Sequence, residues 1–544
     1  MPTTLNTFVG LAPDNTQNAL TFQSLKIQLR FNLMSIQKST QLLLTGMIAA
    51  CLPLQADVSL PNIFGDHMVL QREQVNPIWG KADPGEAIAV SIDGQKHTTV
   101  AATDGKWRVH LDPLKVGGPY QLSIQGNNTV TFNDILAGEV WICSGQSNMQ
   151  WPVQQSDNAE VEIASANYPE IRIISVPQVG KQVAQDNFKG QWEVCTPKTI
   201  ANFSGVGYLF GQRLHSTLGV PIGLIDNAWG GSAAEAWVPR ETLEADGKYA
   251  ELLASWTSKV AAYTDEIHAT KITEYKAWIQ AGKPQPNRRA PRDFRSGQNR
   301  PANIFNGVLN PTIGYGLRGV IWYQGESNAG RAYQYRDLFP LMISTWRELW
   351  DQGDFPFYWV QLADFSREID TPQASNWAEL REAQTMTLKL PNTGQAVIID
   401  AGEGRDIHPR NKQTVANRLA RLALANDYGY DMASESPRYA SMATNGSVIT
   451  LTFDHVSSGG LYAFDVKEPT GFAIAGADRA FVWADAKIIG KNRVEVSTAS
   501  VLNPEAVRYG WATNPVVNLQ DRNGLPLTPF RTDDWPGITI NNVK

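Results

Sequence analysis

The sequence predicts an α/β fold in which a mainly parallel sheet lies under two layers of helices, with a β-rich region before it and another after it. Five short apolar runs alternate with amphipathic segments between residues 136 and 427, a pattern typical of consecutive β-α-β units. Residues 57–135 and 428–544 instead alternate apolar and polar side chains, as half-buried strands do. A chain of 544 residues, 42% of them hydrophobic, is long enough for several such regions.

Residues 1–56 are predicted to be an extension followed by an export signal. Lys38 precedes the apolar stretch 42–50, and "LQA" ends at Ala56 as a small-residue cleavage site. The apolar stretch is too short to span a bilayer. "IAAC", which ends at Cys51, also resembles a lipobox and would allow a lipid anchor. We therefore expect an exported protein, either periplasmic or secreted.

Residues 57–135 are predicted to form a small β-sandwich. The segments "EAIAVSI", "KWRVHLDPL" and "YQLSIQG" alternate, and the turn motifs "DPGE", "DGK" and "VGGP" separate them. Short alternating strands between such turns are typical of sandwiches.

The predicted catalytic region covers residues 136–427. Its strands are the apolar runs 139–145, 221–230, 317–325, 355–365 and 395–402, and its helices are expected at 203–219, 335–350, 378–390 and 411–425. Gly219 is the expected C-cap of the first helix. A polar helical insertion with a basic, Pro-rich loop interrupts the alternation at about 240–305. The segments "SVITLTF", "RAFVWADAKIIG" and "RVEVSTASV" then predict a C-terminal β domain over 428–544.

Charge and cysteine content exclude some functions. The formal net charge of −6 argues against a nucleic-acid partner, because phosphate binding needs a basic face. No cysteine–histidine cluster has zinc spacing, so no metal is expected. Cys143 and Cys195 follow the predicted signal, and either a disulfide or two buried thiols would be compatible with the sequence.

Polar side chains follow each of the five predicted strands. They include Gln146, Ser147 and Asn148 after the first strand, Trp229, Gly230, Gly231 and Ser232 after the second, Gln324, Gly325, Glu326, Ser327 and Asn328 after the third, Gln361 and Asp364 after the fourth, and Asp406 and His408 after the fifth. Since sites in open parallel sheets form at the carboxyl ends of the strands, these residues are expected to meet. Together they supply the parts needed for acyl transfer.

Each part has a candidate role. Ser147 is the candidate nucleophile, and it needs a base to take its proton. Of the seven histidines, His408 alone follows a predicted parallel strand and precedes a helix, and Asp406 is the nearby carboxylate that would orient its ring. The backbone N–H groups of Ser147 and Gly231 would bind the oxyanion, with an amide from Gln324 or Asn328.

Four ordered motifs carry a family resemblance. "GEVWICSGQSNMQWPV", "DNAWGGSAAEAWVP", "WYQGESNA" and "DIHPRNKQTVANRLA" resemble the sialate O-acetylesterases, which belong to the SGNH (GDSL-like) hydrolases. The resemblance implies a flavodoxin-like three-layer α/β/α catalytic domain with flanking β-sandwich regions. It also implies Ser147 as nucleophile, His408 as base, Gly231 or else the adjacent Gly230 as an oxyanion donor, and no cofactor.

Two motifs depart from the superfamily pattern. "QGESN" stands where G-x-N-D is usual, so Gln324 is our first choice as the amide donor and Asn328 our second. Asp406-Ile-His408 stands where D-x-x-H is usual. The acid is therefore left open between Asp406, Glu326 and a Ser-His dyad that has no acid.

The expected reaction is hydrolysis of an O-acetyl ester on a sugar through an acyl-enzyme, with Trp151, Trp229 and Trp237 either stacking on the sugar or packing in the core. Three alternatives remain. In the first, the enzyme uses the same chemistry on acetylated xylan or xyloglucan. In the second, the chain is a secreted, non-catalytic carbohydrate-binding protein. Finally, Glu326 and Asp406 would be the carboxylate pair of a glycosidase.

Overall fold

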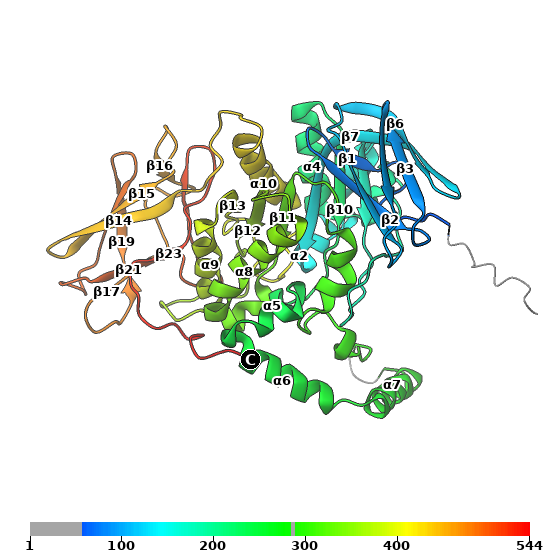
Figure 1. Cartoon of the computed structure of the whole chain (residues 1–544). Helices are drawn as coiled ribbons and strands as arrows, with labels where there is room; N and C mark the ends of the chain where they lie inside the picture. The colour runs from blue at the N-terminus through cyan, green and yellow to red at the C-terminus, as the bar shows by residue number, and fades with distance from the viewer. Residues whose placement is uncertain (1–56, 284–288) are drawn as a thin grey trace, which may run out of the picture. The chain divides into compact units, whose positions relative to one another are not determined.

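A large mixed sheet forms the centre of the computed structural model, which describes residues 57–283 and 289–544 (Figure 1). Its main path has the strand order β13-β12-β11-β7-β10-β8-β9, and all neighbours are parallel except β8 and β9. These strands are β7 (Thr129–Gly145), β8 (Tyr168–Ser175), β9 (Glu193–Cys195), β10 (Ile222–Asp226), β11 (Gly319–Tyr323), β12 (Phe357–Val360) and β13 (Thr393–Ala396). The five predicted strands are therefore confirmed, and β8 is a parallel strand that the sequence reasoning missed.

Helices cover both faces of this sheet. Helices α4 (Gly205–Leu218) and α10 (Lys412–Asn426) share a core with Trp141 and Cys143 of β7. Helices α8 (Ala332–Trp350) and α9 (Asn376–Met386) share a second core with Val140 and Ile142. Successive residues of one strand thus point into different cores, as expected for parallel strands buried on both faces. The mixed α/β architecture and the four predicted helices are confirmed.

Strand β7 continues the N-terminal β region into the central sheet. Its first half pairs antiparallel with β6 (Gly117–Gln125), and its second half lies between β10 and β11. The remaining N-terminal strands are β1 (Val69–Gln71), β2 (Asn76–Lys81), β3 (Ala87–Ile92), β4 (Gln95–Val100) and β5 (Lys106–Leu111). The predicted boundary at residue 135 falls inside a continuous strand, and residues 57–544 form one compact unit.

The insertion is helical, as expected, with α5 (Arg240–Glu244), α6 (Ala250–Ala261) and α7 (Asp265–Gln280). The C-terminal region is built from strands of two to eight residues. They are β14 (Arg438–Asn445), β15 (Val448–Asp454), β16 (Leu461–Ala463), β17 (Phe472–Ala475), β18 (Val482–Trp483), β19 (Asp485–Ile489), β20 (Arg493–Ser497), β21 (Ala506–Tyr509), β22 (Leu519–Asp521) and β23 (Phe530–Arg531).

Cys143 and Cys195 are both free, buried thiols and do not form a disulfide with each other. Burial raises the pKa of Cys195 to about 12 and that of Cys143 well above its usual value. Among the described residues, no helix is both long and apolar enough to cross a membrane. The predicted export signal, with Lys38 and Cys51, lies outside the described residues.

Candidate active site

A tight turn from β7 into α2 (Ser147–Gln150) presents Ser147 at the carboxyl edge of the sheet. Gly145 has φ +132°, and a Cβ atom there would lie 2.2 Å from the carbonyl oxygen of Tyr323 on β11. Only glycine fits this close approach. The N–H of Gln146 then donates to the same carbonyl at 2.8 Å, so the turn is fixed to the neighbouring strand.

His408 reaches Ser147 from the loop between β13 and α10. Its Nε2 lies 2.9 Å from the Oγ of Ser147. On the other side of the ring, Oδ1 of Asp406 lies 3.3 Å from Nδ1 and also accepts the backbone N–H of His408 at 2.9 Å. The indole of Trp151 stacks on the imidazole with 4.8 Å between ring centroids. The structure therefore brings together the three residues predicted to form the triad.

The surroundings of His408 favour a neutral imidazole. Burial is the largest effect and lowers the pKa of His408 below its usual value of 6.5. The charge of Lys412 lowers this pKa further, whereas Asp406 opposes both effects. A neutral ring can accept the serine proton, so His408 is suited to act as a base.

A buried polar network joins the serine turn to the histidine loop. Nδ2 of Asn148 donates to the carbonyl of Ile407 at 3.0 Å and to Oε1 of Glu326 at 2.7 Å. Nζ of Lys412 donates to Oδ1 of Asn148 at 2.7 Å. Burial lowers the pKa of Lys412 to about 7 and raises the pKa of Glu326. The sequence reasoning gave Asn148 no role and missed Lys412, and a lysine in the first turn of α10 was the available signal.

The two adjacent glycines after β10, Gly230 and Gly231, differ in whether the backbone N–H already has a hydrogen-bond acceptor. The N–H of Gly230 donates to Oε1 of Gln150 at 2.7 Å, and a Cβ atom at Gly230 would lie 3.3 Å from that of Ser147. Among the described residues, the N–H of Gly231 has no hydrogen-bond acceptor. Of the two, Gly231 is therefore the one that still has an N–H available for an oxyanion.

The prediction that Gln324 donates to the oxyanion is wrong in this geometry. Gln324 is fully buried, and its amide nitrogen donates to the carbonyl of Ser232 at 3.1 Å and to Oδ1 of Asn328 at 2.7 Å. Both amide hydrogens are thus in use. Asn328 is also buried, and its Nδ2 donates to Oε2 of Glu235 at 3.0 Å. Oδ1 of Asn328 also accepts the N–H of Ala234 at 2.9 Å, so the pair links the segment after β11 to the segment after β10.

The contacts of Glu326 do not fit its two alternative roles, as the acid of the triad or as one carboxylate of a glycosidase pair. Its carboxyl group is hydrogen-bonded to Asn148, and its Oε2 is buried without a partner among the described residues. It makes no ion pair with His408, whereas Asp406 does. Because a glycosidase needs two carboxyl groups facing a sugar across a cleft, a carboxyl group with one oxygen bonded to Asn148 and the other buried does not fit that alternative.

The remaining polar side chains at the sheet edge fix loops. Oδ1 of Asp364 accepts the N–H of Gly402 at 2.8 Å, which ties the end of β12 to the segment after β13. Nε2 of Gln361 donates to Oγ1 of Thr385 on α9 at 2.9 Å. We assign neither residue to the chemistry.

A cleft of about 620 Å³ opens beside Ser147. Its lining includes the amides of Gln150, Gln154, Gln155, Gln178 and Asn202, the ring of Trp151, and the carboxyl group of Asp226. Trp237 is fully buried and Trp229 is 9% exposed, so both belong to the core. Of the three tryptophans predicted to stack or pack, only Trp151 lines the cleft. In the described part of the chain, no three histidine, cysteine or carboxylate side chains gather as a metal site.

Comparison with known proteins identifies the family. The family model described as carbohydrate esterase, sialic acid-specific acetylesterase matches residues 137–271 and 305–425. The mouse sialate O-acetylesterase is 32% identical over 522 residues, which cover 86% of this chain and 92% of that protein. The chain belongs to the sialate O-acetylesterase family. It is a carboxylic ester hydrolase.

Other relatives agree with this assignment. The human sialate O-acetylesterase is 31% identical over 542 residues, covering 89% of this chain and 94% of that protein. A crystal structure of a carbohydrate acetylesterase from Xanthomonas citri is 37% identical, with a TM-score of 0.75, and the match covers 88% of this chain and all of that one. Family membership and the Ser147–His408 contact both argue against a non-catalytic binding protein.

The acid limb of the pH–rate profile of this esterase is expected below pH 6.5. The base must be neutral, so kcat/KM falls as pH drops through the pKa of His408, which burial places below 6.5. Lys412→Met removes a nearby positive charge and should move this limb to higher pH, whereas Asp406→Asn removes a negative charge and should move it lower. Steady-state kcat/KM between pH 4 and 9 measures both shifts. If the acid limb moved in the same direction in both variants, the assignment of His408 as the base would be contradicted.

Asp406→Asn is also expected to lower kcat at the plateau by roughly ten- to a thousand-fold. The Asp406 side chain is 54% exposed, and its ion pair with His408 is long at 3.3 Å. Loss of a triad acid costs about 10⁴-fold in serine proteases, so a weaker loss is expected here. Glu326→Gln is the matched control. If only the Glu326 variant lost activity in this range, Glu326 and not Asp406 would be the acid.

Proposed function

We propose that this protein hydrolyses O-acetyl esters on sugars, with Ser147 as nucleophile and His408 as base, in a catalytic region of the SGNH type. The observation that carries this proposal is the 2.9 Å contact between Oγ of Ser147 and Nε2 of His408, with Asp406 beside the other ring nitrogen. The amide-lined cleft next to Ser147 supports a polar, neutral ligand such as a sugar.

The proposed first half-reaction forms an acetyl-enzyme. Oγ of Ser147 attacks the acetyl carbonyl carbon, and its proton passes to Nε2 of His408. Asp406 stabilises the resulting imidazolium through Nδ1. The backbone N–H groups of Ser147 and Gly231 donate hydrogen bonds to the carbonyl oxygen as it becomes negatively charged. As the tetrahedral intermediate collapses, the bond between the acetyl carbon and the sugar oxygen breaks, and His408 gives its proton to that oxygen to form the sugar hydroxyl.

The second half-reaction uses the same groups with water. His408 takes a proton from a water molecule, which attacks the acetyl carbonyl carbon. Collapse of the second intermediate breaks the bond to Oγ of Ser147, and His408 returns the proton to the serine. Acetate is released, and no cofactor takes part.

The stacked Trp151 gives this base a fixed orientation. Its indole lies nearly parallel to the imidazole, at an interplanar angle of 14°, and its Nε1 donates to the carbonyl of Gln155 at 2.9 Å. The ring of Trp151 also lines the cleft. We infer that Trp151 both holds His408 and forms part of the surface against which the sugar lies.

The family relatives make O-acetylated sialic acid the first candidate substrate. One observation favours a second candidate, an acetylated neutral sugar such as those of xylan or xyloglucan. No lysine or arginine lines the cleft beside Ser147, and the ionisable residue that does line it is Asp226, whose pKa burial raises to about 7. A sialic acid carboxylate would therefore find amides but no cation at this wall.

Acetate release from a panel of substrates tests the proposal. The panel contains 9-O-acetyl sialic acid, acetylated xylan and acetylated xylo-oligosaccharides, each assayed with the native chain. We expect acetate from at least one of them at a rate well above that of buffer alone. Release only from the sialic acid would select the first substrate class, and release only from the xylan substrates would select the second. No release from any of them would contradict the proposed function.

A further inference from the structure

A second cavity, separate from the cleft beside Ser147, lies between the C-terminal β region and the loop that includes Pro372 and Gln373. Its volume is about 470 Å³, within the range of ligand pockets. The two cavities share no lining residue. We call this one the tryptophan cavity, after its lining residues Trp483, Trp511 and Trp535.

Two of the three tryptophans, Trp483 and Trp535, are open to solvent, whereas Trp511 is 8% exposed. Trp483 is 40% exposed, and its Nε1 donates to the carbonyl of Asp370 at 2.8 Å, which fixes the ring against the neighbouring loop. Trp535 is partly exposed, and its ring centroid lies 5.6 Å from that of Phe481. Large exposed aromatic rings with a fixed orientation offer flat apolar faces, against which the C–H face of a sugar ring packs.

The charged side chains that line the tryptophan cavity are both arginines. The guanidinium of Arg479 lies 5.1 Å from the ring centroid of Trp535 and makes no ion pair among the described residues. Arg508 lies 4.2 Å from the Phe481 ring centroid and 5.0 Å from that of Trp511. No carboxylate lines the cavity. Of these two arginines, Arg479 is the one without a carboxylate partner among the described residues, so an anionic group on a ligand could pair with its guanidinium.

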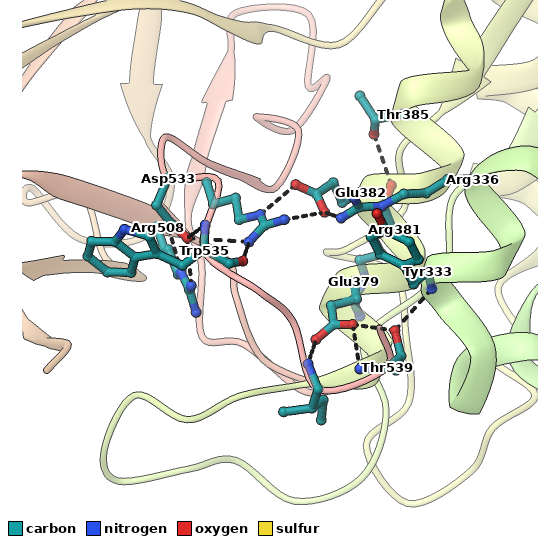
Figure 2. A network of polar contacts seen from close by, with 12 residues as sticks. Tyr333, Arg336, Glu379, Arg381, Glu382, Thr385, Arg508, Asp533, Trp535 and Thr539 are labelled. Carbon is teal, nitrogen blue, oxygen red and sulfur yellow. Dashed lines mark hydrogen bonds and ion pairs between the residues drawn. The ribbon is translucent and has the colours of Figure 1, made fainter. Parts of the chain in front are cut away.

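The wall that carries Arg508 is fixed by a network of ion pairs (Figure 2). Arg508 donates to both oxygens of Asp533 at 2.8 Å. Arg531 donates to Asp533 and also to Glu382 on α9, which accepts from Arg336 as well. Three guanidinium groups thus share two carboxylates in this network, and Arg479 adds a further positive charge beside it. The network fixes Arg508 in the cavity wall, and Arg479 is the lining arginine that it does not neutralise.

We propose that the tryptophan cavity binds a sugar unit that bears a carboxylate, as part of a glycan. The sugar ring would stack on Trp483 and Trp535, and the carboxylate would pair with Arg479. Guanidinium groups bind carboxylates through two parallel hydrogen bonds, which suits this role. Uronic acids and sialic acids both have this chemistry. The site is independent of the catalytic role of Ser147 and would hold the glycan chain while its acetylated units are hydrolysed.

Binding of unacetylated oligosaccharides to the full chain tests this proposal. The two acidic ligands are 3′-sialyllactose and a xylotetraose that carries one glucuronic acid branch, and their neutral counterparts are lactose and unbranched xylotetraose. Isothermal titration is expected to show at least one acidic ligand binding about tenfold more tightly than its counterpart, a ratio that corresponds to about 1.4 kcal/mol. The acidic ligand that binds identifies the sugar class.

Variants locate the binding. Arg479→Gln should remove the preference for the acidic ligand, and Trp483→Ala should weaken its binding at least tenfold. Arg493→Gln, an exposed arginine on β20 that does not line the cavity, is the matched control and should bind as the native chain does. Equal binding of acidic and neutral ligands, no binding of either acidic ligand, or native binding by both cavity variants would overturn the proposal.

A second readout separates this result from the esterase activity. Arg479→Gln and Trp483→Ala should hydrolyse p-nitrophenyl acetate within about twofold of the native rate, since neither residue lines the cleft beside Ser147. This rate also verifies that the variants are folded. Failure of the catalytic assignment would appear as hydrolysis that survives loss of Ser147, whatever the binding data show.

Discussion

Replacing Ser147 with alanine is expected to lower kcat for acetyl ester hydrolysis by about a million-fold, the loss seen when a serine protease loses its nucleophile. The substitution removes the oxygen that would form the acyl-enzyme. Because the Ser147 side chain is only partly buried and its hydroxyl contacts one side chain among the described residues, that of His408, the fold should be preserved. The measurement is acetate release or p-nitrophenyl acetate hydrolysis, with circular dichroism to verify folding.

Ser327→Ala is the matched control for this loss. Ser327 follows the predicted third strand, is exposed, and uses its backbone N–H rather than its hydroxyl to contact Gln146. Its removal should change kcat by less than about twofold. If Ser147→Ala retained a tenth or more of the native rate, Ser147 would not be the nucleophile.

Replacing His408 with alanine should cost between about 10⁴- and 10⁶-fold in kcat, because an unassisted hydroxyl is a poor nucleophile at neutral pH. The double variant Ser147→Ala/His408→Ala should be no slower than the slower single variant, since residues that act as a unit are not additive. Single-turnover and steady-state rates on one acetyl ester measure both. Two losses that multiplied in the double variant would indicate that the residues act independently.

Much of the fold was predictable because parallel strands buried on both faces leave continuous apolar runs in the sequence. Ser147 and His408 are 261 positions apart, yet the rule that the carboxyl ends of parallel strands meet at one edge predicted their meeting. Strand β8 was missed because its four consecutive buried residues lie between polar neighbours and give only a short apolar run.

The polar partners within the site were harder to predict. Gln324 looked available because the sequence does not show that Ser232 and Asn328 take both of its amide hydrogens. Lys412 lies in an amphipathic helix whose lysines are usually solvated, and only the fold places it against Asn148. Hydrogen-bond partners from distant segments have no periodic signature, so the sequence identified which residues gather but not which of them remain free.

The measurement that tests the central claim most directly is covalent labelling by a fluorophosphonate, followed by mass spectrometry of the digested chain. The reagent reacts with a serine whose proton a neighbouring base removes. We predict a single adduct on the peptide that contains Ser147 in the native chain, and labelling slowed by at least a thousand-fold in His408→Ala. An adduct on a different residue, or equal labelling rates in the two proteins, would contradict the claim that His408 activates Ser147.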